Sequence, residues 1–333
     1  MRQAVFGIFL TIIVCGLIAS RFIVHASTNP RTWIVDARGN EEFTTIQAAL
    51  NQANSGDTVY VKSGAYPEHL MISKPLSLLG ENRETTIIDA QGKEPGSIAV
   101  IAANNVKIAG FTFQNTRGGG NAIWIEGFNE SIVSDNLIAT KSGDGIRVLR
   151  SYGNTISNNL LTNNSYTSIG FDWAHDNSVF NNTIMTNNIG IGASYDTYKN
   201  VFYNNTIAGN NYGILVAMHD SKFFHNILLN NTVQASVYFN LSNTWDNGYA
   251  SGGNYWSDYD LTDSGDKDIG NKPYVINDNN KDNYPVLNIA YLERSTYSTD
   301  IDYSLLVSVI GGIGVIAIIS GVVWRRRKIA KVL

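Results

Sequence analysis

A pair of apolar positions recurs along the middle of the chain at a fixed distance from an asparagine. The asparagines are Asn136, Asn159, Asn182 and Asn205, each 23 residues after the one before, and Asn226, which follows after 21 residues. An apolar residue stands three positions before each asparagine, and an aliphatic residue stands two positions after it. A period of this length predicts a stack of similar units, because one unit cannot bury its apolar face alone.

The residues between these apolar positions predict strands rather than helices. They are mostly Asn, Ser, Thr and Gly, which form helices poorly and suit turns, and no apolar pattern at helical spacing crosses the repeats. Short β-branched strands with turns every 21 to 25 residues indicate a parallel β-helix. Its coils lie about 4.8 Å apart, so the recurring asparagines can bond to one another in a column at one corner.

Both ends of the predicted stack have a segment that can cover it. Residues 44–53 show an amphipathic pattern and are predicted to form a short helix that caps the N-terminal end. Tyr255, Trp256 and Tyr259 are expected to cover the C-terminal end.

Apolar runs near the chain ends predict export and anchoring. Residues 1–26 combine an early arginine with an apolar run and a small-residue site, which indicates a signal peptide or, if it is kept, an anchor. Residues 305–324 carry no charge and are long enough to cross a bilayer, and the basic tail 325–333 places the C-terminus in the cytoplasm. Between them we expect a β-helix domain over 33–245, an acidic closing segment over 246–290 and a juxtamembrane linker over 291–304.

Composition narrows the function classes. The 333 residues carry a formal net charge of −4 without a basic stripe along the repeats, which argues against a nucleic-acid partner. Cys15 is the one cysteine in the sequence, so neither a disulfide framework nor a thiol metal site can form. The predicted C-terminal helix also makes the membrane an expected partner.

Aligning the repeats brings polar and aromatic residues into four adjacent rows near one turn of each coil. Flat aromatic faces beside carboxylates and an arginine suit a sugar chain, which offers apolar ring faces and hydroxyl edges. Residues near a turn are also ordinary solvent-facing cover, so both interpretations stay open. This candidate strip comprises Arg150, Tyr152, Asp172, Trp173, His175, Asp176, Tyr195, Asp196, Tyr198, His219 and Asp220.

The early coils carry a family resemblance. The stretch IVDARGNEEFTTIQAALNQANSGDTVYVKSGAYPEHLMISKPLSLLGE, followed by TTIIDA and the Asn-rich coils, resembles the pectin-lyase-like right-handed β-helix proteins. Within them it resembles the NosD-like group, also described as carbohydrate-binding and sugar-hydrolysis domains. The resemblance covers residues 33–288, and GGNYWSDYDLTDSGDKDIGNKPYVINDNNKDNYPV is similar to the segment that closes the repeats in many surface members. It implies an all-β, right-handed parallel β-helix (a solenoid) of about nine coils.

One segment of the candidate strip resembles an enzyme. GFDWAHDNS, residues 170–178, is similar to the Asp-Pro-His-Asp segment of mannuronan C5-epimerases, with Trp-Ala in place of a single Pro. The resemblance implies that His175 is a base, Tyr198 or Tyr152 its acid partner and Arg150 the group that neutralises the uronate carboxyl. The candidate catalytic residues are His175, Tyr198, Arg150 and Asp172.

Two further resemblances suggest activities that the residues do not support. GFTFQNTRGGGNAIWI resembles an early segment of pectin methylesterases, but the Asp-bearing motifs that carry ester hydrolysis there have no match. The NosD name implies copper. His175 and His219 share a row but lie two coils apart, about 9–10 Å at the interstrand spacing, which is too far for one metal with ligand bonds of about 2 Å.

The closing segment offers oxygen ligands that suit calcium. Asp278, Asn280 and Asp282 alternate as in a calcium loop, but Asn283 and Ile289 stand where an EF-hand needs Gly and Glu. A solvated acidic loop explains the same composition. The candidate calcium ligands are Asp258, Asp260, Asp263, Asp266, Asp268, Asp278 and Asp282.

Together these patterns predict a membrane-anchored cell-surface protein that binds a polysaccharide along one face of the solenoid. Two other hypotheses stay open. One is a carbohydrate-active enzyme, either a uronate C5-epimerase or a polysaccharide lyase. The other is a structural stalk or adhesin without sugar chemistry.

Overall fold

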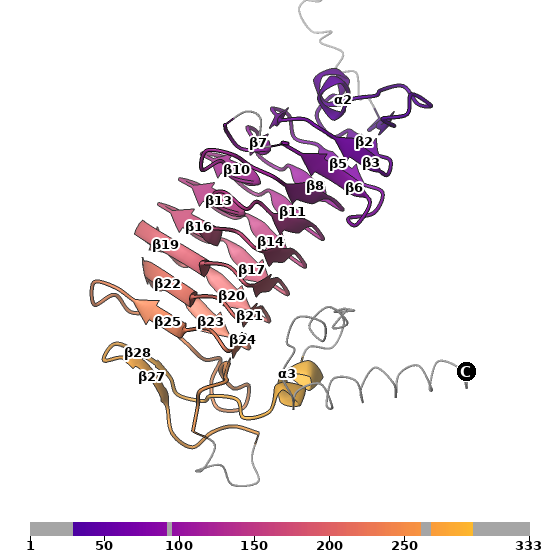
Figure 1. Cartoon of the computed structure of the whole chain (residues 1–333). Helices are drawn as coiled ribbons and strands as arrows, with labels where there is room; N and C mark the ends of the chain where they lie inside the picture. The colour runs from indigo at the N-terminus through magenta and orange to yellow at the C-terminus, as the bar shows by residue number, and fades with distance from the viewer. Residues whose placement is uncertain (1–28, 92–94, 261–267, 296–333) are drawn as a thin grey trace, which may run out of the picture.

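The protein is a stack of β-strand coils that forms one long solenoid (Figure 1). A computed structural model describes residues 29–91, 95–260 and 268–295. Successive coils add parallel strands to three sheets, which contain nine, eight and nine strands in the part of the chain described. The predicted parallel β-helix of about nine coils is therefore confirmed.

The three sheets take their strands in rotation along the chain. Sheet A consists of β1 (Thr32–Val35), β2 (Thr58–Val61), β5 (Ser77–Gly80), β8 (Lys107–Ala109), β11 (Ile132–Ser134), β14 (Thr155–Ser157), β17 (Ser178–Phe180), β20 (Val201–Tyr203) and β23 (Lys222–Phe224). Sheet B consists of β3 (Gly64–Tyr66), β6 (Thr86–Asp89), β9 (Thr112–Gln114), β12 (Leu137–Ala139), β15 (Leu160–Thr162), β18 (Thr183–Met185), β21 (Thr206–Ala208), β24 (Ile227–Leu229) and β26 (Tyr255–Trp256). Sheet C consists of β4 (Leu70–Ile72), β7 (Ala99–Ile101), β10 (Ile123–Glu126), β13 (Ile146–Leu149), β16 (Thr167–Asp172), β19 (Ile189–Tyr198), β22 (Tyr212–His219) and β25 (Val233–Val237).

The ends of the solenoid are covered by other elements. Helix α2 (Ile46–Gln52) buries Ile46, Ala49 and Leu50 at the N-terminal end, as the amphipathic pattern predicts. The carboxylate of Glu68 accepts hydrogen bonds from the first backbone N–H groups of this helix, at 2.8 and 2.9 Å. The other end carries the antiparallel hairpin of β27 (Tyr274–Asn277) and β28 (Asn280–Asp282), followed by α3 (Ile289–Ser295).

No helix among the described residues is long and apolar enough to cross a membrane. The predicted leader 1–26 and the predicted span 305–324 both lie outside those residues.

The two apolar positions of each repeat form columns inside the solenoid. Val133, Ile156 and Val179 lie opposite one another in sheet A, and all three are fully buried. Ile138 and Leu161 lie opposite each other in the matching column of sheet B and are equally buried. The inward residues at these two positions therefore supply a column of the core in each sheet, and the strands of sheet C add two inward residues each, as Ile146 and Val148 of β13 show.

Asparagines form a buried ladder at the corner between sheets A and B. Asn159 shows the pattern: its backbone and side-chain N–H groups both donate to Oδ1 of Asn182, each at 3.0 Å. The same side chain also donates to the carbonyl of Val133 in the preceding coil. The members of this ladder are Asn136, Asn159, Asn182, Asn205, Asn226 and Asn254.

The prediction of a ladder at one corner was incomplete, because the other two corners carry ladders as well. Between sheets C and A, Asn154, Asn177 and Asn200 bond in sequence. Between sheets B and C, the ladder members are Asn164, Asn187, Asn210 and Asn231. Each corner thus satisfies its buried backbone N–H groups with amide oxygens from the next coil.

The first residue of each Asn pair has a different function from the second. Asn158, Asn181 and Asn204 have φ of 57°, 56° and 56°, in the left-handed region that asparagine tolerates better than most residues. The first asparagine therefore turns the chain at the corner, and the second enters the ladder.

Stacked aromatic side chains close the C-terminal end of the core. Phe223 stacks on Trp245 with ring centroids 4.4 Å apart, and Trp256 stacks on Tyr274 at 4.0 Å. Trp256 thus covers the core as predicted, but Trp245 and Tyr274 share this function and were missed. Tyr255 faces outward from sheet B instead, because neighbouring side chains of a strand point to opposite faces.

Asp282 ends the asparagine ladder of the corner between sheets A and B. It is fully buried, and its carboxylate accepts hydrogen bonds from the backbone of Asn254, the indole of Trp256 and the backbone of Tyr284. Burial raises the pKa of Asp282 from its ordinary value of 3.8 to about 6.

We expect Asn182→Ala to destabilise the fold. The change removes the oxygen that accepts both N–H groups of Asn159 and leaves its backbone N–H buried without this acceptor, and it also removes the side-chain amide that Asn182 donates to the carbonyl of Ile156 and to Asn205. The free energy of unfolding should fall by about 2–4 kcal/mol, measured by urea denaturation with circular dichroism. Asn211→Ala is the control, because Asn211 is exposed and bonds to Asn188 at the surface. Equal losses in the two variants would contradict a structural function of the ladder.

We also expect Asp282 to make stability depend on pH. Because its pKa is raised in the folded protein, folding favours the protonated carboxyl, and this contribution is lost as pH rises from about 4 through 6. The loss should be about 3 kcal/mol. Asp282→Asn stays uncharged and keeps one acceptor oxygen, so its stability should fall less over this range. Unfolding free energies of both proteins between pH 4 and pH 7 check this, and parallel curves would exclude it.

Candidate functional site

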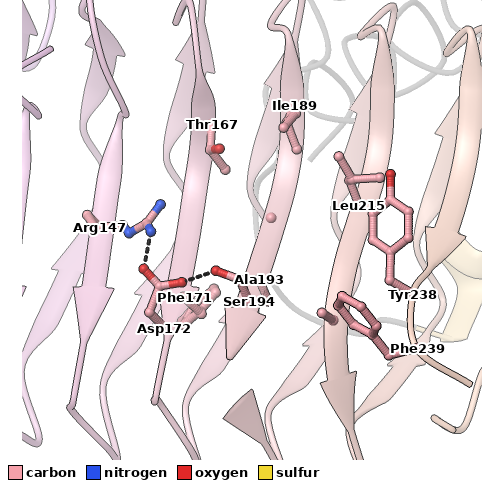
Figure 2. Close-up of a pocket in the computed structure, with 12 residues that line it drawn as sticks. Arg147, Thr167, Phe171, Asp172, Ile189, Ala193, Ser194, Leu215, Tyr238 and Phe239 are labelled. Carbon is pink, nitrogen blue, oxygen red and sulfur yellow. Dashed lines mark hydrogen bonds and ion pairs between the residues drawn. The ribbon is translucent and has the colours of Figure 1, made fainter. Parts of the chain in front are cut away.

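A groove crosses the outer face of sheet C. It has a volume of about 270 Å³ and extends over β13, β16, β19 and β22 to Tyr238 and Phe239, which directly follow β25 (Figure 2). Arg147, Asp172 and Ser194 lie at one end of it, and Leu215 and Tyr238 lie at the other. We call this the sheet C groove.

Two glycines make room for the groove. A Cβ atom on Gly170 would lie 2.9 Å from Nη1 of Arg147, and one on Gly192 would lie 2.8 Å from Cγ2 of Thr167. Any larger residue at either position would displace these side chains. The two glycines therefore leave the middle of sheet C without side chains. The neighbouring strands carry Arg147 and Leu215 at the same position.

One end of the groove is a hydrogen-bonded polar cluster, which we call its polar floor. It consists of Arg147, Asp144, Asp172 and Ser194, with Arg147 at its centre. Its guanidinium donates to Oδ2 of Asp144 at 3.0 Å and to Oδ2 of Asp172, and the hydroxyl of Ser194 donates to Oδ1 of Asp172. The side chain of Asp172 is 6% exposed. Burial raises the pKa of Asp144, whose other oxygen accepts the backbone N–H of Thr167.

An aromatic platform lies directly beside this floor. Trp173 follows Asp172 and Tyr195 follows Ser194, and the two rings stack with centroids 4.2 Å apart and an angle of 7° between their planes. The guanidinium of Arg150 lies over the opposite face of Trp173, 5.2 Å from the ring centre. Arg150, Trp173 and Tyr195 all have positive φ, so the chain turns at the same place in three successive coils. Trp173 and Tyr195 remain 40% and 62% exposed.

A second column of rings follows at the next position of the turn. Tyr152, His175, Tyr198 and His219 stack in this order, with centroids 5.3, 4.9 and 5.5 Å apart. This row was predicted from the repeat alignment and is confirmed. Nδ1 of His175 lies 2.8 Å from the carboxylate of Asp176, and Nδ1 of His219 lies 3.0 Å from that of Asp220.

The structure brings the candidate strip together but corrects its register at β19. The uniform alignment placed Tyr195 beside Asp172 and Asp196 beside Trp173. The chain from Asn187 to Ile189 is one residue shorter than from Asn164 to Thr167 in the coil before, so Ser194 lies opposite Asp172 and Tyr195 stacks on Trp173. An irregularity between Ala193 and Thr197 then restores the register, and Tyr198 lies opposite His175. Asp196 instead approaches His219, with 3.6 Å between Oδ1 and Nε2.

Arg150, predicted to neutralise a uronate carboxyl, forms an ion pair within the chain. Its guanidinium pairs with Glu126 at 3.0 Å, and its side chain is 62% exposed. Arg147, which sequence reasoning missed, is the arginine that reaches the groove. One signal could have found it: Arg147 is a charged residue between two buried aliphatic residues of a short strand, so it must point outward. Asp144, Ser194 and Tyr238 carried no comparable signal.

The candidate calcium ligands do not form a metal centre among the residues described. Within them, no group of three or more His, Cys, Asp or Glu side chains could hold a metal ion. Asp258 accepts the hydroxyl of Tyr274, Asp282 is occupied by the ladder, and Asp278 is exposed at the hairpin turn. Asp263 and Asp266 lie outside the described residues. The remaining candidates are Asp260 and Asp268.

Comparison with known proteins gives structures of low identity. A pectin methylesterase from Aspergillus niger matches with a TM-score of 0.48 and 14% identity, over 71% of this chain and 89% of that chain. Carrot pectin methylesterase matches with a TM-score of 0.37 and 15% identity, over 69% and 87%. A rhamnogalacturonan lyase matches with a TM-score of 0.37 and 13% identity, over 59% and 74%. Scores this low carry no argument about function. No curated protein matches the chain.

A family model described as "Periplasmic copper-binding protein (NosD)" matches residues 50–261. The residues described do not fit a copper centre, because they contain no cluster of possible ligands. The ring of Tyr198 lies between His175 and His219, and His69 and His225 bond to backbone carbonyl oxygens.

The match extends over more than half of the chain and over most coils of the solenoid. It agrees with the resemblance found in the early coils. The chain therefore belongs to the NosD family.

Proposed function

We propose that this protein binds a polysaccharide along the sheet C groove and the candidate strip. The observation that supports this most is the stacked pair Trp173 and Tyr195, which stands directly beside the polar floor of the groove. A sugar ring has an apolar face and a hydroxyl edge, so it needs these two kinds of surface next to each other.

The platform supplies the apolar contact. Both rings are partly exposed, and their stacking fixes their orientation before a ligand arrives, which lowers the entropy cost of binding. Tyr238 and Phe239, 48% and 84% exposed, add apolar surface at the far end of the groove.

The floor supplies hydrogen bonds. Asp172 and Ser194 are held in place by each other and by Arg147, so their remaining lone pairs point from fixed positions. The five coils under the groove span roughly 19 Å at the usual interstrand spacing, which suits a chain of sugars rather than one.

The cellular location is part of this proposal. The family description names the periplasm, and the apolar runs 1–26 and 305–324 predict export and a single C-terminal anchor. We therefore propose a surface-exposed β-helix domain over 33–245 and a closing segment over 246–290.

The enzymatic hypothesis has less support. His175 has its ring faces covered by Tyr152 and Tyr198, and Arg150, the expected partner of a uronate carboxyl, is already paired with Glu126. A uronate C5-epimerase or a lyase therefore remains an outcome to be tested beside a structural stalk.

We expect Trp173→Ala to weaken polysaccharide binding at least about tenfold, because the change removes half of the stacked platform. Proton NMR with a panel of neutral and acidic polysaccharides, with and without calcium, measures binding as broadening of the sugar signals. Tyr249→Ala is the matched control, since Tyr249 is 65% exposed and its ring contacts Tyr284 in the closing segment.

The same spectra distinguish the other hypotheses. New product signals that disappear in His175→Ala would establish an enzyme. Unchanged sugar signals across the whole panel would exclude sugar binding and leave the structural stalk. Equal losses in Trp173→Ala and Tyr249→Ala would exclude the platform.

A further inference from the structure

Both arginines of the binding surface are already neutralised by the protein. Arg147 pairs with Asp144 and Asp172, and Arg150 pairs with Glu126. A carboxylate on a sugar would meet a guanidinium whose charge Asp144 and Asp172 already balance, and it could become the counterion of Arg147 only in exchange for one of them, such as Asp172. That exchange would leave the 6% exposed carboxylate of Asp172 without its counterion, which is strongly unfavourable.

Within the described residues, the ion-pair contacts of the carboxylates beside the ring column are to histidines, not to an arginine or lysine. The side chains of Asp176, Asp196 and Asp220 are 58%, 73% and 67% exposed, and they face the two histidines of the column. Lys199 lies over the ring of Tyr198 in the same column, with its Nζ atom 5.8 Å from the ring centre.

The charges of the groove, the candidate strip, their ion-pair partners and Lys199 therefore sum to an acidic surface. With neutral histidines, six carboxylates stand against three cations, a formal balance of −3. The carboxylates are Glu126, Asp144, Asp172, Asp176, Asp196 and Asp220, and the cations are Arg147, Arg150 and Lys199.

We propose that the site selects glycans without carboxylate groups: its ligand is a neutral polysaccharide, and polyuronates are rejected. This inference rests on the proposed function and names its substrate class. Each carboxylate oxygen of Asp172 already accepts one hydrogen bond and has a lone pair left for a sugar hydroxyl. A hydroxyl donates to such an oxygen, whereas a uronate carboxylate has no proton to donate and is repelled by the same group.

Matched hexasaccharides test this selection on the full-length chain. The mannose hexasaccharide and the mannuronate hexasaccharide of the same β-linkage differ only at carbon six, and the glucose and glucuronate hexasaccharides form a second pair. In calorimetric titration at low salt, we expect the neutral member of a pair to bind at least about tenfold more tightly. Added salt should narrow this ratio, because it screens the repulsion of the uronate.

A pair of charge variants separates local from general repulsion. Asp196→Asn combined with Asp220→Asn removes two charges beside the column and should narrow the neutral-to-uronate ratio. Glu84→Gln combined with Asp135→Asn removes two exposed charges at turns outside sheet C and should leave the ratio unchanged.

The outcomes are distinct. A uronate member that binds as tightly as its neutral counterpart, or more tightly, overturns the selection while the proposed binding function stands. The same narrowing in both variants also overturns it, because the overall charge would then be the cause. Failure of every hexasaccharide to bind overturns the proposed function and this inference with it.

Discussion

Buried backbone polar groups at the corners are the constraint on which the rest of the structure depends. A coil that closes on itself in three short strands must turn three times inside the stack, where water cannot reach the turning N–H groups. The asparagine ladders solve this at all three corners, because one amide oxygen accepts the backbone and side-chain N–H groups of the coil before it. Each ladder also ties one coil to the next. The spacing and register of the coils are therefore set at the corners, and the sheets follow.

The side chains on the outer surface follow the register that the corners set. Because coils repeat without drift, residues at equal positions stack into rows, and the row from Tyr152 to His219 is the clearest case. One local departure changes the chemistry. One residue fewer between Asn187 and Ile189 than in the coil before sets Ser194 against Asp172 and Tyr195 onto Trp173. The polar floor and the platform thus come to lie side by side because a single coil is irregular on its outer face while its corners stay in register.

The sequence predicted the features that depend on strict periodicity and missed those that depend on exceptions. The buried columns, one ladder, the capping helix and the ring column all follow from one constant alignment. The ladder through Asn200 was missed because it passes next to Ser221, which breaks the asparagine pattern. Ser194 was missed because a uniform alignment cannot detect that one residue is absent before β19 and regained within the same strand. The outward direction of Arg147 could be inferred from its two aliphatic neighbours in the strand, but its pairing with Asp144 and Asp172 depends on the register between coils.

The modular stacking has an evolutionary consequence. Since each 23-residue unit carries its own member of every ladder, duplication of a whole unit would add one rung to all three corners and leave the neighbouring rungs intact. The groove would grow by one strand spacing, and with it the length of ligand that fits. Gain or loss of a few residues on the outer face, as in β19, would alter the side chains presented without touching the corners. Ligand length and ligand chemistry can thus change separately in a solenoid of this kind.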